Sequence, residues 1–305
     1  MSITYTALES ANLRLAAMIE AEVRAQLADM ASIRNFISFA GDISGTGSDA
    51  VRLRLASWGA KTPFATAVDG ATVGATTPTY ATADITVGRS CLRYDITDLA
   101  TMTGLGRDLD PFTLGESMAA SAEARIMEII CNTFSGASSS VGSTGVDMDV
   151  DDFLSALYTL ELANNNAPFL CCLHNRQFAD LQAALRTENN NFLAFYSATP
   201  EMSSIKGQGY VGSLLGVDIF KSDYVITVNA GADRCGLMWG QGGLAYAIGT
   251  PAPLAGDAEM RPSGTPVTVA FQRNEAAGLT EVVGHLYCGA AIVEDDRVVK
   301  IVTDA

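Results

Sequence analysis

Two adjacent cysteines and two histidines are the side chains in this sequence best suited to nucleophilic or acid–base chemistry. Cys171 and Cys172 lie in a short apolar run that His174 follows, and His285 lies in a second apolar segment. A thiolate beside a histidine can act as a nucleophile. Adjacent cysteines in an apolar strand, however, usually pack as small hydrophobic side chains. We therefore predict that these residues are structural and that the chain has no catalytic residue.

Two short motifs match parts of enzyme sites but lack the remaining parts. Gly207, Gly209 and Gly212 have the GxGxxG spacing of a dinucleotide-binding loop, which requires a strand before it and a long helix after it. The residues that follow predict a strand instead. Ser203 and Lys206 have the SxxK spacing of penicillin-binding enzymes without the partner motifs of those enzymes. We expect a surface loop here, with no catalytic residue and no cofactor.

Three aspartates have the spacing of the first ligands of a calcium-binding loop: Asp147, Asp149 and Asp151. Such a loop requires glycine at its sixth position and glutamate at its twelfth, where this chain has Asp152 and Tyr158. Carboxylates are also favoured at a helix N-terminus, where they meet the positive end of the helix dipole. We predict a helix start here and no metal site.

The composition indicates a globular protein with a sizeable core and an acidic surface. Of the 305 residues, 48% are hydrophobic and 17% are charged, and the formal net charge is -15. A free-standing nucleic-acid binder needs a basic face, whereas an acidic wall can enclose DNA without trapping it. The six cysteines are scattered without a CxxC pair, as expected for buried thiols in a reducing compartment. We expect no secretory signal and no membrane-spanning segment.

The first half of the chain predicts a helix, a long arm and a second, longer helix. Apolar residues at helical spacing predict a helix that ends before Asn35. Alternating residues at both ends of Ala50–Thr97, around a middle rich in Thr, Ala and Gly, predict a two-stranded arm. A lone hairpin is marginally stable in water, so the arm needs another surface to lie on. A helix is expected over Pro111–Phe134, with Asp110 as its N-cap and Gly136 ending it in the left-handed conformation.

The second half predicts an α/β region followed by a terminal hairpin. Helices and short strands alternate from Asp147 onward, including a buried strand at Phe169–Leu173. The run GVDIFKSDYV suggests a pair of strands. Residues Glu281–Val302 predict a hairpin whose turn is Glu294–Arg297.

This order of parts resembles the HK97-like major capsid proteins of tailed phages along nearly the whole chain. AVRLRLASWG to ADITVGRSCLRYDITDLA resembles the extended loop of that family, and DPFTLGESMAASAEARIMEIICNTF resembles its spine helix. FLCCLHNRQFADLQAAL and YVGSLLGVDIFKSDYV resemble parts of the axial domain, and GHLYCGAAIVEDDRVVKIVT resembles the closing strands. The resemblance implies an α+β fold with an N-terminal arm, an extended β-hairpin loop, a peripheral domain with a long spine helix and an axial α/β domain.

The resemblance also implies a division of the chain. Residues 1–49 would form the N-terminal arm and helix, 50–97 the extended loop and 98–146 the peripheral domain with the spine helix. Residues 147–262 would form the axial domain, and 263–305 the closing strands shared by both domains. The extended loop would lie across a neighbouring subunit, with contacts expected from Arg52, Arg54, Trp58, Lys61, Phe64, Tyr80 and Arg89.

The implied function is structural and not enzymatic. The chain would self-assemble as pentamers and hexamers into the icosahedral capsid of a virion, built in the host cytoplasm around phage double-stranded DNA. The DNA would be held by enclosure, without a membrane. Because residues 1–49 are too short for a cleaved scaffolding segment, a separate scaffolding protein is expected, together with a portal and, optionally, a decoration protein. Two alternatives stay open: an encapsulin-type nanocompartment shell, and a nucleotide-dependent α/β enzyme using GQGYVG.

Overall fold

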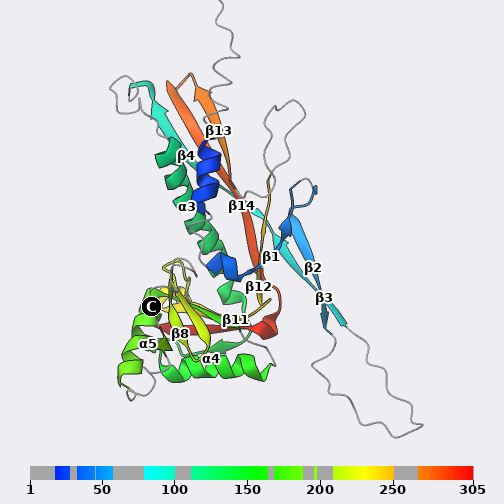
Figure 1. Cartoon of the computed structure of the whole chain (residues 1–305), viewed down its shortest axis with the longest axis vertical. Coiled ribbons are helices and arrows are strands. Elements are labelled where there is room, and N and C mark those ends of the chain that lie inside the picture. The colour runs from blue at the N-terminus through cyan, green and yellow to red at the C-terminus, as the bar shows by residue number, and fades with distance from the viewer. Residues whose placement is uncertain are drawn as a thin grey trace, which may run out of the picture.

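The computed structural model describes residues 18–27, 33–44, 46–57, 79–99, 111–163, 168–187, 196–197, 209–250 and 267–304. These residues form an α+β structure with a five-stranded sheet, an eight-stranded sheet and a separate two-stranded hairpin. The five-stranded sheet lies along the long axis of the molecule, and the eight-stranded sheet lies across one end of it (Figure 1). The hairpin projects sideways from the region where the two sheets meet.

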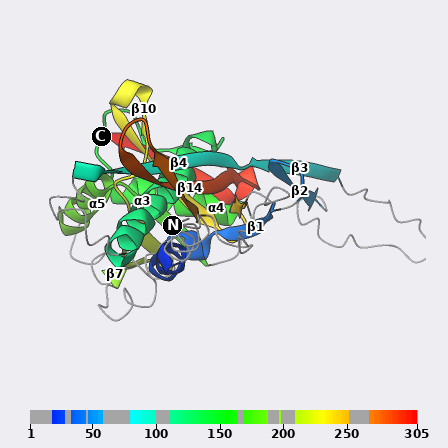
Figure 2. The same ribbon diagram turned by 90° about the horizontal axis from the view of Figure 1, so that it is seen from above.

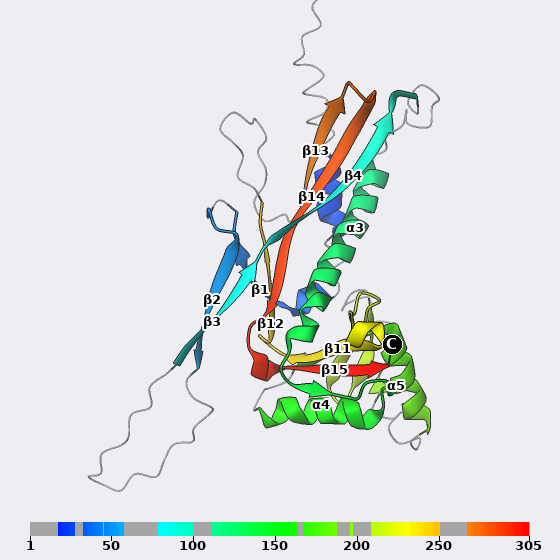
Figure 3. The ribbon, with the colours of Figure 1, turned by 180° about the vertical axis from the view of Figure 1, so that it is seen from behind.

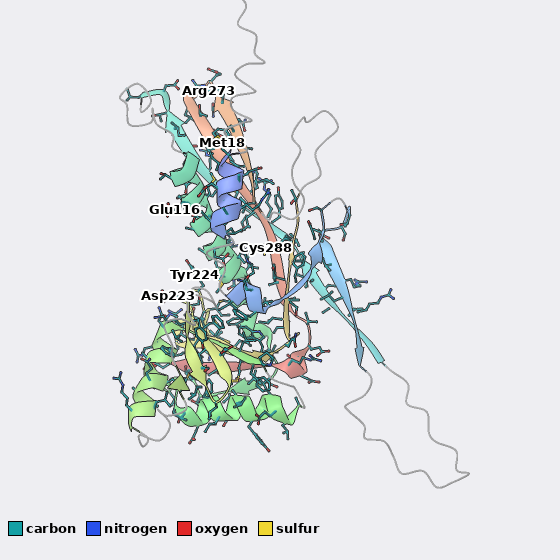
Figure 4. All side chains as sticks on the ribbon, viewed as in Figure 1. Met18, Glu116, Asp223, Tyr224, Arg273 and Cys288 are labelled. Atoms are coloured by element: carbon teal, nitrogen blue, oxygen red, sulfur yellow. The ribbon has the colours of Figure 1, made fainter. Side chains whose placement is uncertain are left out.

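The five-stranded sheet is built around one long central strand. This strand pairs with β4 along one side, and with β13 and then β12 along the other, while β1 adds to β12. The strands are β14 (Leu279–Ile292), β4 (Gly88–Thr97), β13 (Val267–Asn274), β12 (Leu244–Ile248) and β1 (Ser38–Asp42). At its far tip, Arg273 donates two hydrogen bonds of 2.7 Å to the carboxylate of Asp98, which joins β13 to the end of β4 (Figure 4).

A long helix, α3 (Pro111–Asn132), covers one face of this sheet (Figure 3). Its apolar stripe includes Met118, Ile126 and Ile130, all nearly fully buried. The helix was expected to continue to Phe134 and to end at a left-handed Gly136. It instead ends at Asn132 and tightens into a 3₁₀ turn, η2 (Phe134–Gly136), in which Gly136 has no positive φ. The predicted cap, Asp110, lies outside the described residues.

The N-terminal segment packs beside α3. Residues 18–27 are helical, and Ile19, Val23 and Leu27 are buried in the same core as α3. The Glu20 carboxylate accepts a 2.7 Å hydrogen bond from the backbone N–H of Val269 in β13. A short 3₁₀ turn, η1 (Ile33–Phe36), follows before β1. The predicted N-terminal helix is therefore confirmed within the described residues, and its carboxylate satisfies a backbone group of a sheet strand.

The eight-stranded sheet separates two cores. Helices α4 (Val150–Leu162) and α5 (Asn175–Thr187) pack on one face, and the other face meets the end of α3, where the rings of Phe134 and Trp239 lie 6.3 Å apart. The strands are β5 (Ser140–Val141), β15 (Val298–Asp304), β11 (Asp233–Gly240), β6 (Phe169–Leu173), β9 (Val217–Lys221), β8 (Tyr210–Leu214), β7 (Tyr196–Ser197) and β10 (Thr227–Val228). The turns η4 (Asn229–Gly231) and η5 (Asp295–Arg297) connect strands.

Three predictions of strand pairing were wrong. The terminal hairpin does not exist, because β14 and β15 belong to different sheets and η5 carries the chain between them. The run GVDIFKSDYV supplies β9, whose antiparallel partner β8 precedes it. The arm was expected to be two-stranded over Ala50–Thr97, but it divides at Val87. Before that residue, β2 (Ala50–Ser57) pairs with β3 (Thr79–Thr86), and after it β4 joins the large sheet. In each case the actual partner lies far away in sequence or in a segment that local pattern does not identify.

Candidate inter-subunit surface

The β2–β3 hairpin is the described part of the chain that reaches farthest from the two sheets. Its eight residue pairs run from Ala50 opposite Thr86 to Ser57 opposite Thr79. Viewed from above, it extends laterally beyond the rest of the molecule (Figure 2). Its apolar cover lies at its base, where Ile85 is fully buried against Ala245 and Ala247 of β12. A two-stranded element that projects from its base presents backbone groups to whatever lies beside it.

A cross-strand ion pair stabilises the exposed part of this hairpin. Arg52 and Asp84 face each other in the register, and Nε and Nη2 of Arg52 donate to the two carboxylate oxygens at 2.7 and 2.8 Å. The hydrogen bond from Arg52 lowers the pKa of Asp84 below its ordinary value. Both side chains are largely exposed, so the pair adds geometric definition and only a small stabilisation.

The hairpin joins the large sheet at a close backbone crossing. A Cβ placed on Gly289 of β14 would lie 2.1 Å from the carbonyl oxygen of Thr86, the last residue of β3. Only glycine tolerates such an approach without movement of the backbone. The N–H of Val87 donates to Asp49 at 2.8 Å, so the chain stays tied to the hairpin until it enters β4. The direction of the hairpin is therefore fixed by the packing at its base.

The structure describes the side chains of three of the residues predicted to contact a neighbouring subunit, and these three lie on two different strands. Arg52 and Arg54 are exposed on β2, and Arg89 is exposed beyond the crossing, at the start of β4 and opposite Tyr287. The backbone of Tyr80 lies in β3, opposite Ala56. Three further residues, Trp58, Lys61 and Phe64, lie outside the described residues. The inter-subunit role of all seven stays a prediction, as do the segment boundaries proposed from the sequence.

Cys171, Cys172 and His174, which were considered as nucleophiles or bases, have structural surroundings. Cys171 and Cys172 are fully buried in β6, and burial raises the pKa of both thiols. Burial also lowers the pKa of His174, helped by the positive charge of Arg234. The Nδ1 atom of His174 accepts the backbone N–H of Arg176 at 3.2 Å, at the start of α5. Neutral thiols without access to solvent do not act as nucleophiles. Among the other cysteines, Cys91 is exposed, against the expectation that all six are buried.

The motif-like segments also have structural roles. Asp149 caps α4 in a reciprocal box: its carboxylate accepts the N–H of Asp152 at 2.8 Å, and the Asp152 carboxylate accepts the N–H of Asp149. Gly209 and Gly212 belong to the β8–β9 hairpin, so a strand follows them where a dinucleotide site would need a helix. Ser203, Lys206 and Gly207 lie outside the described residues. In the part of the chain that is described, no group of three His, Cys, Asp or Glu residues could hold a metal ion.

Sequence reasoning missed a set of exposed large apolar residues. Phe39, Tyr158 and Leu162 are each more than half exposed. Leu162 ends α4, and Tyr158 was predicted to belong to the apolar pattern of this helix, whereas it is exposed. The signal was present, because Leu154, Tyr158 and Leu162 recur every four residues and therefore share one side of a helix. No described helix is long and apolar enough to span a membrane.

Comparisons with known proteins identify solved structures that share this architecture. No protein-family model and no curated protein sequence matches the chain. Solved structures do match the chain. One, from Mycobacterium phage Che8, is 16% identical in sequence with a TM-score of 0.55, and the match covers 88% of this chain and 89% of that one. The acidic stable capsid of Helicobacter pylori bacteriophage KHP30 is 12% identical with a TM-score of 0.57, over 90% and 92%. The SrpI encapsulin of Synechococcus elongatus PCC 7942 is 13% identical with a TM-score of 0.58, over 88% and 85%.

Most of the similar structures are phage capsids, and the likeness covers about nine-tenths of the chain. The chain therefore has the HK97-like fold, as the order of its parts predicted. At this level of identity the likeness concerns the fold, which phage capsids and at least one encapsulin share.

Proposed function

We propose that this chain is the major capsid protein of a tailed phage and that it assembles as pentamers and hexamers into an icosahedral shell around double-stranded DNA. The observation that carries the proposal is the lateral β2–β3 hairpin on an HK97-like fold, whose described apolar contacts with the rest of the chain centre on Ile85 at its base. A shell of thin subunits needs elements that overlap their neighbours. The net charge of -15 suits a wall that encloses DNA without adhering to it.

The proposal gives the chain a structural role and no enzymatic one. The fully buried thiols of Cys171 and Cys172 and the capping role of Asp149 support this view. The proposal also includes a separate scaffolding protein, a portal and an optional decoration protein as partners, and assembly in the host cytoplasm.

The test is a hairpin truncation. Ser57 and Thr79 are directly paired, so residues 58–78 can be replaced by Asn-Gly, the preferred two-residue turn between antiparallel strands. We expect the wild type to form large closed particles in electron micrographs. The truncated subunit should keep the circular dichroism and unfolding transition of the wild type but form no closed particles. Normal particles from the truncated chain would contradict the role given to the hairpin, and a wild type that stays monomeric even when a scaffolding protein is supplied would contradict the shell.

An encapsulin-type compartment is the second candidate, because the SrpI encapsulin is among the similar structures. The contents of particles isolated from the native source separate the two. Nuclease-protected double-stranded DNA supports the phage capsid, and a co-purifying cargo protein without DNA supports the encapsulin.

A further inference from the structure

The outward side of α4 carries large apolar residues with an acidic residue toward each end. Tyr158 is 63% exposed and Leu162 is 67% exposed, and Leu154 is half-buried beside them. Asp151 and Glu161 lie on the same side of the helix and are exposed. Residues three, four, seven and ten apart share one face of a helix, so these five form a single stripe. The stripe is large, apolar and negatively charged.

The outward side of α5 has the opposite character at the same spacing. Arg176 and Arg186 are exposed toward the two ends of the helix, and the exposed residues between them on that side are Ala179 and Ala183. Asp151 and Glu161 on α4, like Arg176 and Arg186 on α5, are ten residues apart, which is about 15 Å along a helix. The α5 stripe is therefore small and carries an arginine toward each end, and of these Arg176 is ion-paired with Asp180 and Asp147 of its own chain.

Both stripes lie at the margin of the molecule. Viewed down the shortest axis, α4 runs along the lower margin and α5 lies at the adjoining one (Figure 1), and the view from behind shows the same placement (Figure 3). The inward sides of the helices are occupied by the core beneath them, through residues such as Phe153 and Leu160 of α4 and Leu181 of α5. Figure 4 shows side chains projecting outward from the free side of α4. In a wall one subunit thick, neighbours meet at such margins.

We infer that α4 of one copy of this chain packs against α5 of the next copy. Tyr158 and Leu162 would cover the alanines, and Arg186 would meet an acidic end of the α4 stripe whichever way the helices run: Glu161 if they run parallel and Asp151 if they run antiparallel. Because two different surfaces meet, the contact is heterologous and repeats head to tail, which closes a ring when the rotation allows it. Subunits of net charge -15 repel one another, so a local match of opposite charges selects the orientation of approach.

The inference rests on the proposed function and adds to it the surface through which the rings would form. Arg186 is the more informative of the two arginines. Arg176 already lies 3.2 Å from Asp180 and 3.5 Å from Asp147 of its own chain, so its replacement would disturb contacts within the subunit.

The experiment combines one charge reversal with two candidate rescues. Arg186→Glu should raise the protein concentration needed for assembly by about tenfold, because an acidic residue then meets the acidic stripe. Adding Glu161→Arg restores assembly if the helices run parallel, and adding Asp151→Arg restores it if they run antiparallel. Lys221→Glu, an exposed substitution in the same sheet region with the same change in net charge, is the matched control and should assemble like the wild type. Sedimentation and electron microscopy give the readout, and circular dichroism verifies folding.

The outcomes separate the contact from the shell. If Arg186→Glu assembles like the wild type, or if neither double variant recovers, the contact is wrong while the shell stands. If the wild type forms no particle even when a scaffolding protein is supplied, the proposed function is wrong and so is the contact. Should Arg186→Glu fail to fold, Ala183→Gln takes its place: added bulk opposite Tyr158 should block assembly, and normal particles would overturn the inference.

Discussion

Two consecutive stretches of this chain, β3 and β4, look alike in sequence and have opposite surroundings. Both alternate between inward and outward residues, and only Val87 separates them. In β4, Leu92, Tyr94 and Ile96 face the core that α3 covers, and β14 pairs along the whole strand. In β3, Ile85 is the buried apolar anchor. The difference teaches that pairing with a distant strand, β14, keeps β4 in the body of the molecule, whereas β3, paired with the nearby β2, extends away from it.

The largest effect is expected from a substitution in α3, the helix that packs over β4. Ile126→Asp buries a charge in the α3 stripe, where Ile126 is 1% exposed, and we expect a loss of at least about 4 kcal/mol in the free energy of unfolding. Ala120→Asp, on the exposed side of the same helix, should change it by about 0.5 kcal/mol or less. Denaturant titration followed by circular dichroism measures both. A cooperative wild-type transition for Ile126→Asp would contradict the assigned packing of α3.

The next largest effect is expected at the base of the β2–β3 hairpin. Ile85→Ala removes the buried anchor at the hairpin base and should cost about 2–4 kcal/mol there, because the small cluster around it cannot refill the space. Hydrogen exchange is the measurement: amides of β2 and β3 should lose protection while those of β4 keep theirs. Equal loss in both regions would show that hairpin and sheet unfold as one unit and would remove the distinction drawn above.

A smaller effect tests the crossing between the two regions. Gly289→Ala places a methyl group 2.1 Å from the Thr86 carbonyl oxygen and should destabilise the protein by about 1–3 kcal/mol. Gly88→Ala is the control one residue past the junction, since its Cβ would meet nothing within 4 Å. We expect its melting temperature to match or slightly exceed that of the wild type. Similar melting temperatures for the two variants would disprove the close approach.

The smallest effect concerns the ion pair on each side. Hydrogen bonds from Arg52 and Arg273 hold the pKa values of Asp84 and Asp98 below their ordinary value. A carboxyl group whose pKa is lowered in the folded state stabilises the fold. The full contribution is present at pH values above the group's ordinary pKa, near 4, and it is lost as the pH falls through the lowered, folded-state pKa. Asp84→Asn should weaken amide protection in the hairpin at pH 6, and its difference from the wild type should shrink as the pH falls through the lowered pKa of Asp84. Asp98→Asn should do the same at the tip of the sheet. A difference that persists unchanged at low pH would count against the pairs.

Local patterns predicted the elements of this fold better than their partners. The α3 stripe, the capped start of α4 and the burial of Cys171 and Cys172 were all readable, because each depends on residues within a few turns of helix or one strand. The pairing of β14 with β4, nearly 200 residues earlier, was not readable, since strand pairing depends on contacts that local sequence does not encode. The same limit concealed the division of the arm at Val87. The α4 stripe could have been found from its four-residue spacing.

The hydrogen bond between Glu20 and the backbone of β13 bears on how this protein avoids aggregation through a sheet edge. An unpaired strand edge can recruit a foreign strand and start ordered fibrils. If the chain assembles into a shell as proposed, it is especially at risk, because shell assembly and fibril formation would draw on the same subunits. By occupying the Val269 N–H, Glu20 places a negative charge where an incoming strand would dock. Growth through this edge is thereby discouraged without any change to the faces through which copies are proposed to associate.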